Sequence, residues 1–381
     1  MATANGSGPQ TQTIPTLVDT LLRRARTAHA SSQFAEAARL YLAAARLLRG
    51  RPDQQAEALL EAAHALRLVG YFRRALQLYA RVQALAREMG DEALWMDARV
   101  GEGMARRAMG DLKAAITCFR EALAYYQEQE DPEGIGYTLW CLGGALRLTG
   151  NFEEALDCLM EALDLFADEK PTTAEGYVRC ALGGLSRMRG EYDASLAYYR
   201  EAERILTACE DLFGRAYAAC GMANAYRMLG DVESAHHYFA QAQQRYHQIG
   251  DRVSYAYTLW GEGTLFKVTY RIGQARERFR QALQLFRATG DDRGIAYAYT
   301  GLAELLLLEG RAPKQVQRYL EAARLRAAQH GYTFERLHAE LLLHLSGLQP
   351  VAGGLEALRE AYRRCGSQWL EDQMSLPLNI P

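Results

Sequence analysis

The sequence predicts an all-α protein in which about eight helix–turn–helix repeats stack into a solenoid. The first observation is a glycine every 40 positions, with one gap at Tyr270: Gly70, Gly110, Gly150, Gly190, Gly230 and Gly310. The second is that small residues recur with the same period, in series that run from Ala75 to Ala275 and from Ala122 to Ala322. A fixed period of this length is typical of repeat proteins, in which each unit buries its apolar face against its neighbours.

Each element of the repeat follows from local chemistry. The glycine ends the first helix because it accepts the left-handed conformation that follows a helix C-terminus. Residues that suit a helix start come directly after it: Asp111, Asn151, Glu191 and Asp231. Small residues such as Gly103 and Gly143 allow close helix approach, and large residues such as Phe152 and Leu159 fill the space between the helices. We therefore expect two antiparallel helices in every 40 residues.

The segment Leu139–Phe166, LWCLGGALRLTGNFEEALDCLMEALDLF, resembles a tetratricopeptide repeat at nearly every signature position. The matching residues are Leu142, Gly143, Leu146, Gly150, Phe152, Ala155, Leu159 and Ala162. With its 40-residue spacing, the chain is similar to the long-repeat subclass, which includes kinesin light chains, Pins-type scaffolds and bacterial peptide-sensing regulators. The resemblance covers roughly residues 16–330. It implies a right-handed superhelix whose first helices line a concave groove.

Four regions are expected along the chain. Residues 1–15 form a disordered N-terminal tail, 16–330 form the eight repeats, 331–366 form two capping helices, and 367–381 form an extended tail. The segment Ser375–Pro381 contains two prolines and several apolar residues, like a peptide ligand. We expect it to pack against the last helices or to enter the groove.

Composition limits the possible functions. The net charge of −2 gives no bulk affinity for nucleic acid or for a membrane surface. The seven cysteines show no CxxC spacing, which argues against a zinc site or a disulfide framework, so neither a metal nor a cofactor is expected. The N-terminus lacks the pattern of a signal peptide, and no apolar run could span a bilayer. A cytoplasmic location is expected.

The family resemblance places one stripe of each first helix on the inner surface, with residues spaced 3, 4 and 3 apart. One position of that stripe forms a basic ladder: Arg67, Arg107, Arg147, Arg187, Arg227 and Lys267. Arginine forks suit carboxylates and phosphates, so the ladder is a candidate site for an anionic ligand. The alternative is that turn carboxylates such as Asp111 neutralise the arginines locally.

The other stripe positions complete the candidate site. Tyrosines recur from Tyr137 to Tyr297, and packing between repeats is favoured over ligand contact for them. Trp140 and Trp260, at another stripe position, are better ligand-contact candidates. Gly144 and Gly184 occupy the remaining stripe position, which we call the floor position, and they leave space there for a ligand. By family resemblance, Asn224 is a clamp for a peptide backbone. The candidate ligand-binding residues are Arg107, Tyr137, Trp140, Gly144, Arg147, Tyr177, Cys180, Gly184, Arg187, Asn224, Arg227, Trp260 and Lys267.

A binding module is the function that these features favour. The partner would be another protein or an extended peptide with acidic residues and apolar anchors. One alternative is a regulator that senses a small molecule or a signalling peptide. Nucleic-acid binding is another, and catalysis a third, for which Glu102 and Glu262 stand in identical Gly-Glu-Gly frames. No catalytic constellation is identified, and the oligomeric state stays open.

Overall fold

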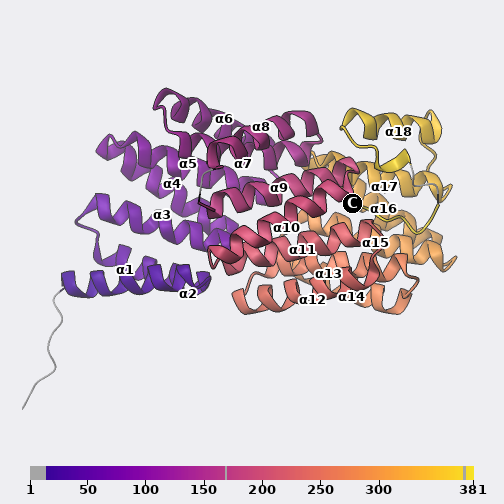
Figure 1. Cartoon of the computed structure of the whole chain (residues 1–381), viewed down its shortest axis with the longest axis horizontal. Helices are drawn as coiled ribbons and strands as arrows, with labels where there is room; N and C mark the ends of the chain where they lie inside the picture. The colour runs from indigo at the N-terminus through magenta and orange to yellow at the C-terminus, as the bar shows by residue number, and fades with distance from the viewer. Residues whose placement is uncertain (1–13, 168–169, 372–374) are drawn as a thin grey trace, which may run out of the picture.

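The computed structural model describes residues 14–167, 170–371 and 375–381. Residues 1–13 of the predicted N-terminal tail lie outside this range. The described residues form eighteen α-helices and one short 3₁₀ helix, without any strand. Successive helices stack side by side from α1 at one end of the molecule to α18 at the other (Figure 1). The predicted all-α repeat fold is confirmed.

The first helices of the repeats are α1 (Ile14–Ala30), α3 (Pro52–Leu68), α5 (Glu92–Ala108), α7 (Pro132–Thr149), α9 (Thr173–Arg189), α11 (Leu212–Met228), α13 (Arg252–Val268) and α15 (Asp292–Leu308). The second helices are α2 (Phe34–Leu47), α4 (Phe72–Met89), α6 (Leu112–Glu128), α8 (Phe152–Phe166), α10 (Tyr192–Ala208), α12 (Val232–Ile249), α14 (Ile272–Thr289) and α16 (Pro313–His330). Helices α17 (Thr333–Leu345), α18 (Gly354–Arg364) and η1 (Trp369–Glu371) follow the eighth repeat.

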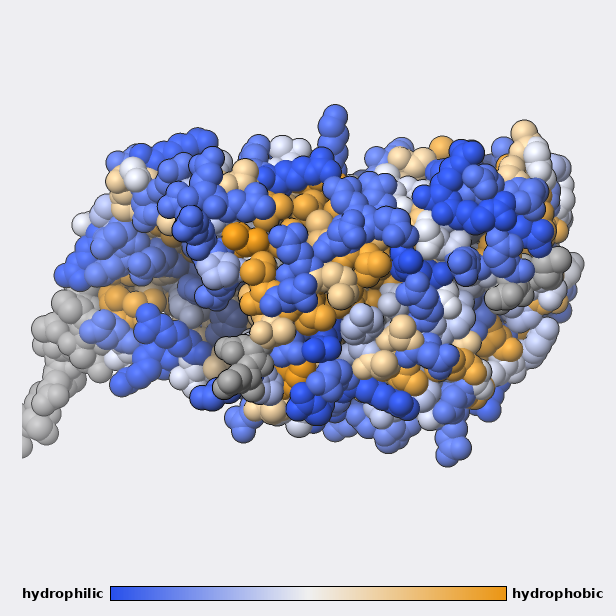
Figure 2. All heavy atoms as spheres, turned by 45° about the horizontal axis from the view of Figure 1, so that its top comes forward, coloured by the Kyte–Doolittle hydropathy of each residue, from blue (hydrophilic) through white to orange (hydrophobic). Residues whose placement is uncertain are grey.

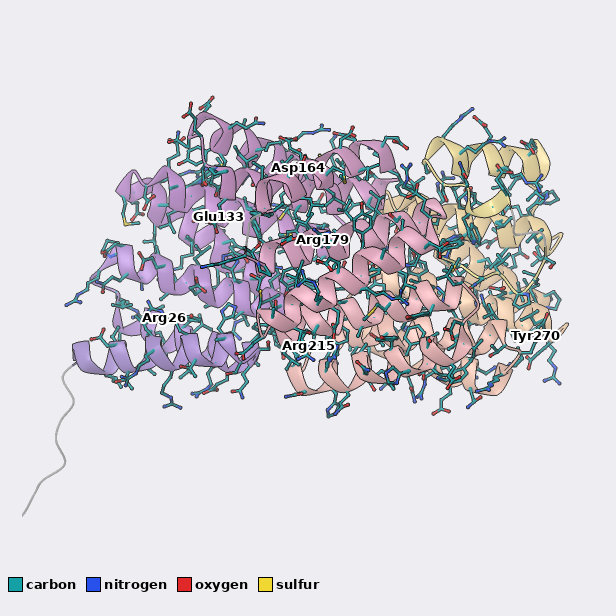
Figure 3. All side chains as sticks on the ribbon, in the orientation of Figure 1. Arg26, Glu133, Asp164, Arg179, Arg215 and Tyr270 are labelled. Atoms are coloured by element: carbon teal, nitrogen blue, oxygen red, sulfur yellow. The ribbon has the colours of Figure 1, made fainter. Side chains whose placement is uncertain are left out.

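The turns within the repeats have the predicted left-handed conformation. All six glycines of the 40-residue series have positive φ, from 64° at Gly310 to 97° at Gly190. At the gap in the series, Tyr270 takes the same conformation with φ of 59°, and its side chain points into solvent at the edge of the molecule (Figure 3). The backbone geometry of the turn is therefore conserved where the glycine is not.

The helix starts follow the expectation only in part. The carboxylate of Asp111 accepts a hydrogen bond from Ala114 N at 3.3 Å, and that of Asp231 accepts one from Ser234 N at 3.0 Å. The residues at the equivalent positions of α8 and α10, Asn151 and Glu191, make no such bond. A polar residue at the right position is thus not sufficient for a side-chain cap.

The small residues of the repeat lie against buried rings, as predicted. A Cβ atom added at Gly103 would lie 2.6 Å from Phe119, and one added at Gly263 would lie 2.8 Å from Phe279. Both rings belong to second helices and are fully buried. Outside the core, the surface is mostly hydrophilic, with apolar atoms gathered in the middle of one face (Figure 2). No described helix has the length and apolarity needed to cross a membrane.

The first helices form an inner layer, since each contacts the first helix of the next repeat from α3 to α15. We call the surface of this layer that carries the basic ladder the inner face. Parts of the solenoid that lie one superhelical turn apart also contact each other, since α17 packs against α7. Thr333 donates to the Thr149 carbonyl at 2.7 Å, and Ser367 donates to the Met188 carbonyl at 2.6 Å. Residues 184 and 179 positions apart are joined in this way.

Candidate functional site

The basic ladder lies on the inner face, and its central arginines contact neutral groups. Arg107 Nη1 donates to the Cys141 carbonyl at 3.5 Å, and Arg147 Nη1 lies 3.3 Å from Met188 Sδ. The Nε atom of Arg187 is buried and has no hydrogen-bond partner among the described residues. The middle of the inner face therefore carries guanidinium groups that are held by neutral atoms.

Turn carboxylates do not neutralise these arginines. Asp111 pairs with Arg106 at 2.9 Å, and Glu191 pairs with Arg189 at 2.8 Å. In both pairs the partner lies outside the ladder. Burial lowers the pKa of Arg107, and the neighbouring ladder arginines lower it further, as expected where positive charge is not balanced. Of the two interpretations of the ladder, the one that invokes local pairing is wrong for these two repeats.

The two floor glycines leave room, and the arginines of the preceding repeats take it. A Cβ atom at Gly144 would collide with Arg107 Nη1. A Cβ atom at Gly184 would lie 3.6 Å from Arg147 Nη1 and 3.2 Å from the Tyr199 hydroxyl. Guanidinium groups therefore line the floor at Gly144 and Gly184. The candidate Cys180 does not face solvent, because its side chain is completely buried.

The aromatic ladder mainly packs repeats together. The Tyr177 hydroxyl donates to Asp211 at 2.7 Å, and the Tyr257 hydroxyl donates to Asp291 at 3.2 Å. Each bond joins a first helix to the residue that caps the first helix of the next repeat. This is the packing role that was favoured for the tyrosines.

The two inner tryptophans differ in exposure. Trp140 is half-buried and lies between Tyr137 and Tyr177, with ring centroids 5.6 and 6.0 Å away. Trp260 is only 6% exposed and packs on Tyr297 at 4.4 Å. Trp140 and Tyr137 are thus available at the surface, whereas Trp260 belongs to the core.

The segment 375–381 lies against the C-terminal part of the inner face, as the sequence suggested. Its backbone is held at three points: Leu378 N donates to Glu304, Trp369 Nε1 donates to the Asn379 carbonyl at 2.9 Å, and Arg227 Nη2 donates to the Ile380 carbonyl at 2.8 Å. The Leu378 and Ile380 side chains, on either side of Asn379, are at most 2% exposed. In Figure 1 the chain end accordingly lies over the body of the solenoid.

Arg227 is the centre of this contact. Besides holding Ile380, its guanidinium donates to the side-chain oxygen of Asn379, whose amide nitrogen donates back to the Arg227 carbonyl at 3.2 Å. The Asn224 side-chain oxygen accepts a hydrogen bond from Arg227 Nη2 at 3.1 Å. Asn224 therefore orients Arg227, which in turn binds the segment. Burial, followed by the neighbouring Arg187, lowers the pKa of Arg227 to about 9.

The last cation of the ladder is paired. Lys267 Nζ lies 2.5 Å from Glu304, and both side chains are at most 1% exposed. Burial lowers the pKa of Lys267, and the carboxylate of Glu304 opposes that effect. Glu304 is not among the candidates predicted from the sequence. The available signal was an acidic residue at the stripe position that is glycine at Gly144 and Gly184.

The carboxylates considered for catalysis are held in ion-pair networks. Glu102 accepts from Gln83 at 2.9 Å, from Arg99 at 3.0 Å and from Arg106 at 2.7 Å. Burial alone would raise the pKa of Glu102, but these bonds bring its pKa below the ordinary value. A carboxyl group in this state does not suit general acid chemistry at neutral pH.

A related arrangement recurs four repeats later, with a glutamine at the same position and an arginine from a different helix. Glu262 accepts from Gln243 at 3.0 Å and pairs with Arg278 at 2.6 Å. The repetition indicates a structural role in holding consecutive helices together. Among the described residues, no group of His, Cys, Asp and Glu side chains could hold a metal ion.

A cavity of about 990 Å³ opens between α1, α3 and α5 at the other end of the solenoid. Its lining is mixed polar and apolar, and its charged residues include Arg26, which Figure 3 labels, together with Glu57, Glu61 and Asp97. None of the thirteen candidate residues lines it. The N-terminal repeats are therefore open to solvent where the C-terminal repeats are covered by the segment 375–381.

Comparison with known proteins agrees with this architecture. The tetratricopeptide repeat model matches residues 96–168 and 134–208. A Rap protein in complex with competence and sporulation factor is similar in fold, with a TM-score of 0.65, 13% identity, and coverage of 93% of this chain and 95% of that one.

Two further solved structures are also similar. The Rap conjugation gene regulator of plasmid pLS20, in complex with the Phr* peptide, has a TM-score of 0.60 at 14% identity and covers 82% and 95% of the two chains. The apo quorum sensor NprR from B. thuringiensis has a TM-score of 0.54 at 14% identity and covers 83% and 89%. No curated protein matches the sequence. The family match over residues 96–208 and the repeat geometry together show that this chain contains tetratricopeptide repeats.

Proposed function

We propose that the inner face binds an extended peptide, or an extended segment of a partner protein, that carries both apolar and acidic residues. One observation carries the proposal: the inner face already holds an extended segment, 375–381, through backbone hydrogen bonds and two buried apolar side chains. Backbone bonds combined with pockets for alternate side chains are a general mode of peptide recognition.

The acidic character of the ligand follows from the central arginines. Arg107, Arg147 and Arg187 stand on consecutive repeats and contact neutral atoms or none. A carboxylate that reaches them replaces a weak contact by a charge-assisted bond. The fold likeness to proteins described as peptide complexes and as a quorum sensor supports a peptide-sensing role for this face.

The test is an array of random heptapeptides probed with the purified full-length chain. We expect bound peptides to be enriched in Asp and Glu together with Leu or Ile. The double variant Arg147→Glu, Arg187→Glu should bind them at least tenfold more weakly, because the attraction becomes a repulsion. Its melting temperature should stay close to that of the unmodified chain.

The matched control is Arg73→Glu, Arg74→Glu, which makes the same charge change on exposed residues of the second helix α4. This control should bind the selected peptides as the unmodified chain does. An array without acidic enrichment, or equal binding by both double variants, contradicts the proposal.

A further inference from the structure

The segment 375–381 meets the inner face as a ligand would. It contributes no helix or strand, and its contacts come from the nearby η1 and from α11 and α15, which lie far from it in the sequence. Its recognition has a simple pattern. Two buried apolar side chains, Leu378 and Ile380, flank one amide side chain, Asn379.

Asn379 supplies the specificity within this pattern. Its amide oxygen accepts from the Arg227 guanidinium, and its amide nitrogen donates to the Arg227 backbone carbonyl. A side chain that must both accept and donate at one arginine is well matched by an amide, whereas a carboxylate lacks the donor. Arg227 is itself fixed by Asn224, so the site is oriented by the fold.

Opposing contributions act on this contact. Burial of two apolar side chains favours docking, but ordering seven residues costs conformational entropy that offsets much of this gain. The segment is also tethered to the protein, so its effective concentration at the site is on the order of millimolar. An external peptide with the same pattern has to overcome that concentration before it binds.

Resting on the proposed function, we propose that residues 375–381 are an intramolecular ligand that covers the C-terminal part of the inner face. An external extended peptide with an apolar–amide–apolar pattern displaces them from Arg227. The free protein is therefore autoinhibited at this part of the site, while the arginines of the central repeats stay available.

The experiment uses the full-length chain and a fluorescein-labelled SLPLNIP peptide as the probe, with binding followed by fluorescence anisotropy. In the variant Leu378→Asp, Ile380→Asp the segment should leave the inner face, because both substitutions would bury a charge. That variant should bind the probe at least tenfold more tightly than the unmodified chain. The probe SLPLAIP, which lacks the amide, should bind the same variant at least tenfold more weakly than SLPLNIP.

A second measurement covers the case in which the variant does not fold. Hydrogen exchange of the unmodified chain should show that the amides of Leu378 and Ile380 open far more often than those of α17, and that excess unlabelled SLPLNIP accelerates them. Opening of both segments only together, or a released variant that binds SLPLNIP no better than the unmodified chain, would overturn the inference. Such a result would make the segment a permanent part of the fold.

The two proposals fail in different ways. A peptide array without acidic enrichment contradicts the role of the central arginines and leaves SLPLNIP binding to the released variant untouched. Equal binding of SLPLNIP to the unmodified and the released chain contradicts the autoinhibition and leaves the acidic preference of the central repeats intact.

Discussion

Two ends of the basic ladder can be compared directly. Arg107 and Lys267 occupy the same position of their repeats, and each reaches the floor position of the following repeat, 37 residues further on. Arg107 meets Gly144 there, whereas Lys267 meets Glu304. The repeat thus fixes where a cation points, and the floor residue of the next repeat decides whether its charge is balanced.

The largest expected effect on stability comes from the end of the ladder where Lys267 is paired with Glu304. Lys267→Met should destabilise the protein by about 3–5 kcal/mol, because it leaves the buried Glu304 carboxylate without its cation. The double variant Lys267→Met, Glu304→Leu should recover most of that loss, with urea unfolding as the measurement. Recovery should stop short of the unmodified chain because Leu378 N also loses its acceptor. Equal stabilities of the single and double variants would contradict a buried charged pair.

The C-terminal half also contains a histidine that should make stability depend on pH. Neither ring nitrogen of His338 has a hydrogen-bond partner among the described residues, and burial, followed by Lys267 and Arg293, lowers its pKa to about 3. Between pH 6.5 and 3 the unfolded chain takes up a proton that the folded chain refuses. The stability contributed by neutral His338 is therefore complete above pH 6.5 and is lost as the pH falls.

The measurement is the free energy of unfolding at pH 7 and at pH 5 for His338→Phe and for the unmodified chain. At pH 5 the variant should have lost about 2 kcal/mol less than the unmodified chain, since each pH unit below 6.5 costs about 1.4 kcal/mol. Burial also lowers the pKa of His64 to about 3. His64 therefore contributes to the pH dependence of the unfolding free energy in both proteins. An identical slope in the His338→Phe variant and the unmodified chain would contradict a neutral buried His338.

The comparison can be sharpened by transferring the balanced arrangement to the other end. Gly144→Glu should place a carboxylate beside Arg107, as Glu304 stands beside Lys267. Binding of the acidic array peptides should fall about tenfold, while the stability changes by no more than about 1 kcal/mol, the difference in helix propensity between the two residues. Gly144→Gln is the neutral control, with anisotropy and urea unfolding as the measurements. Equal peptide affinity for the two variants would show that charge at the floor position does not matter.

The sequence predicted the repeat well because its period is a local property. The turn glycines, the small residues against Phe119 and the docking of residues 375–381 all followed from patterns within one or two repeats. The burial and pairing of individual stripe residues could not be predicted from these patterns. Trp260 and Cys180 are buried by neighbouring side chains, which no single repeat specifies. The pairing of Lys267 with Glu304 required the 37-residue offset between a cation and the next floor position, which only the stacked geometry reveals.

The contacts across the superhelical turn have a consequence for how the chain can change. In an open solenoid each repeat touches only its neighbours, so repeats can be gained or lost singly and the protein can unfold from its ends. Here Thr333 is bonded to Thr149, and Ser367 to Met188, over a fixed number of intervening repeats. Duplication or deletion of one 40-residue unit would move every such partner out of reach. The molecule should therefore unfold as a single cooperative unit, and its number of repeats should be constrained to a degree that the separate repeats are not.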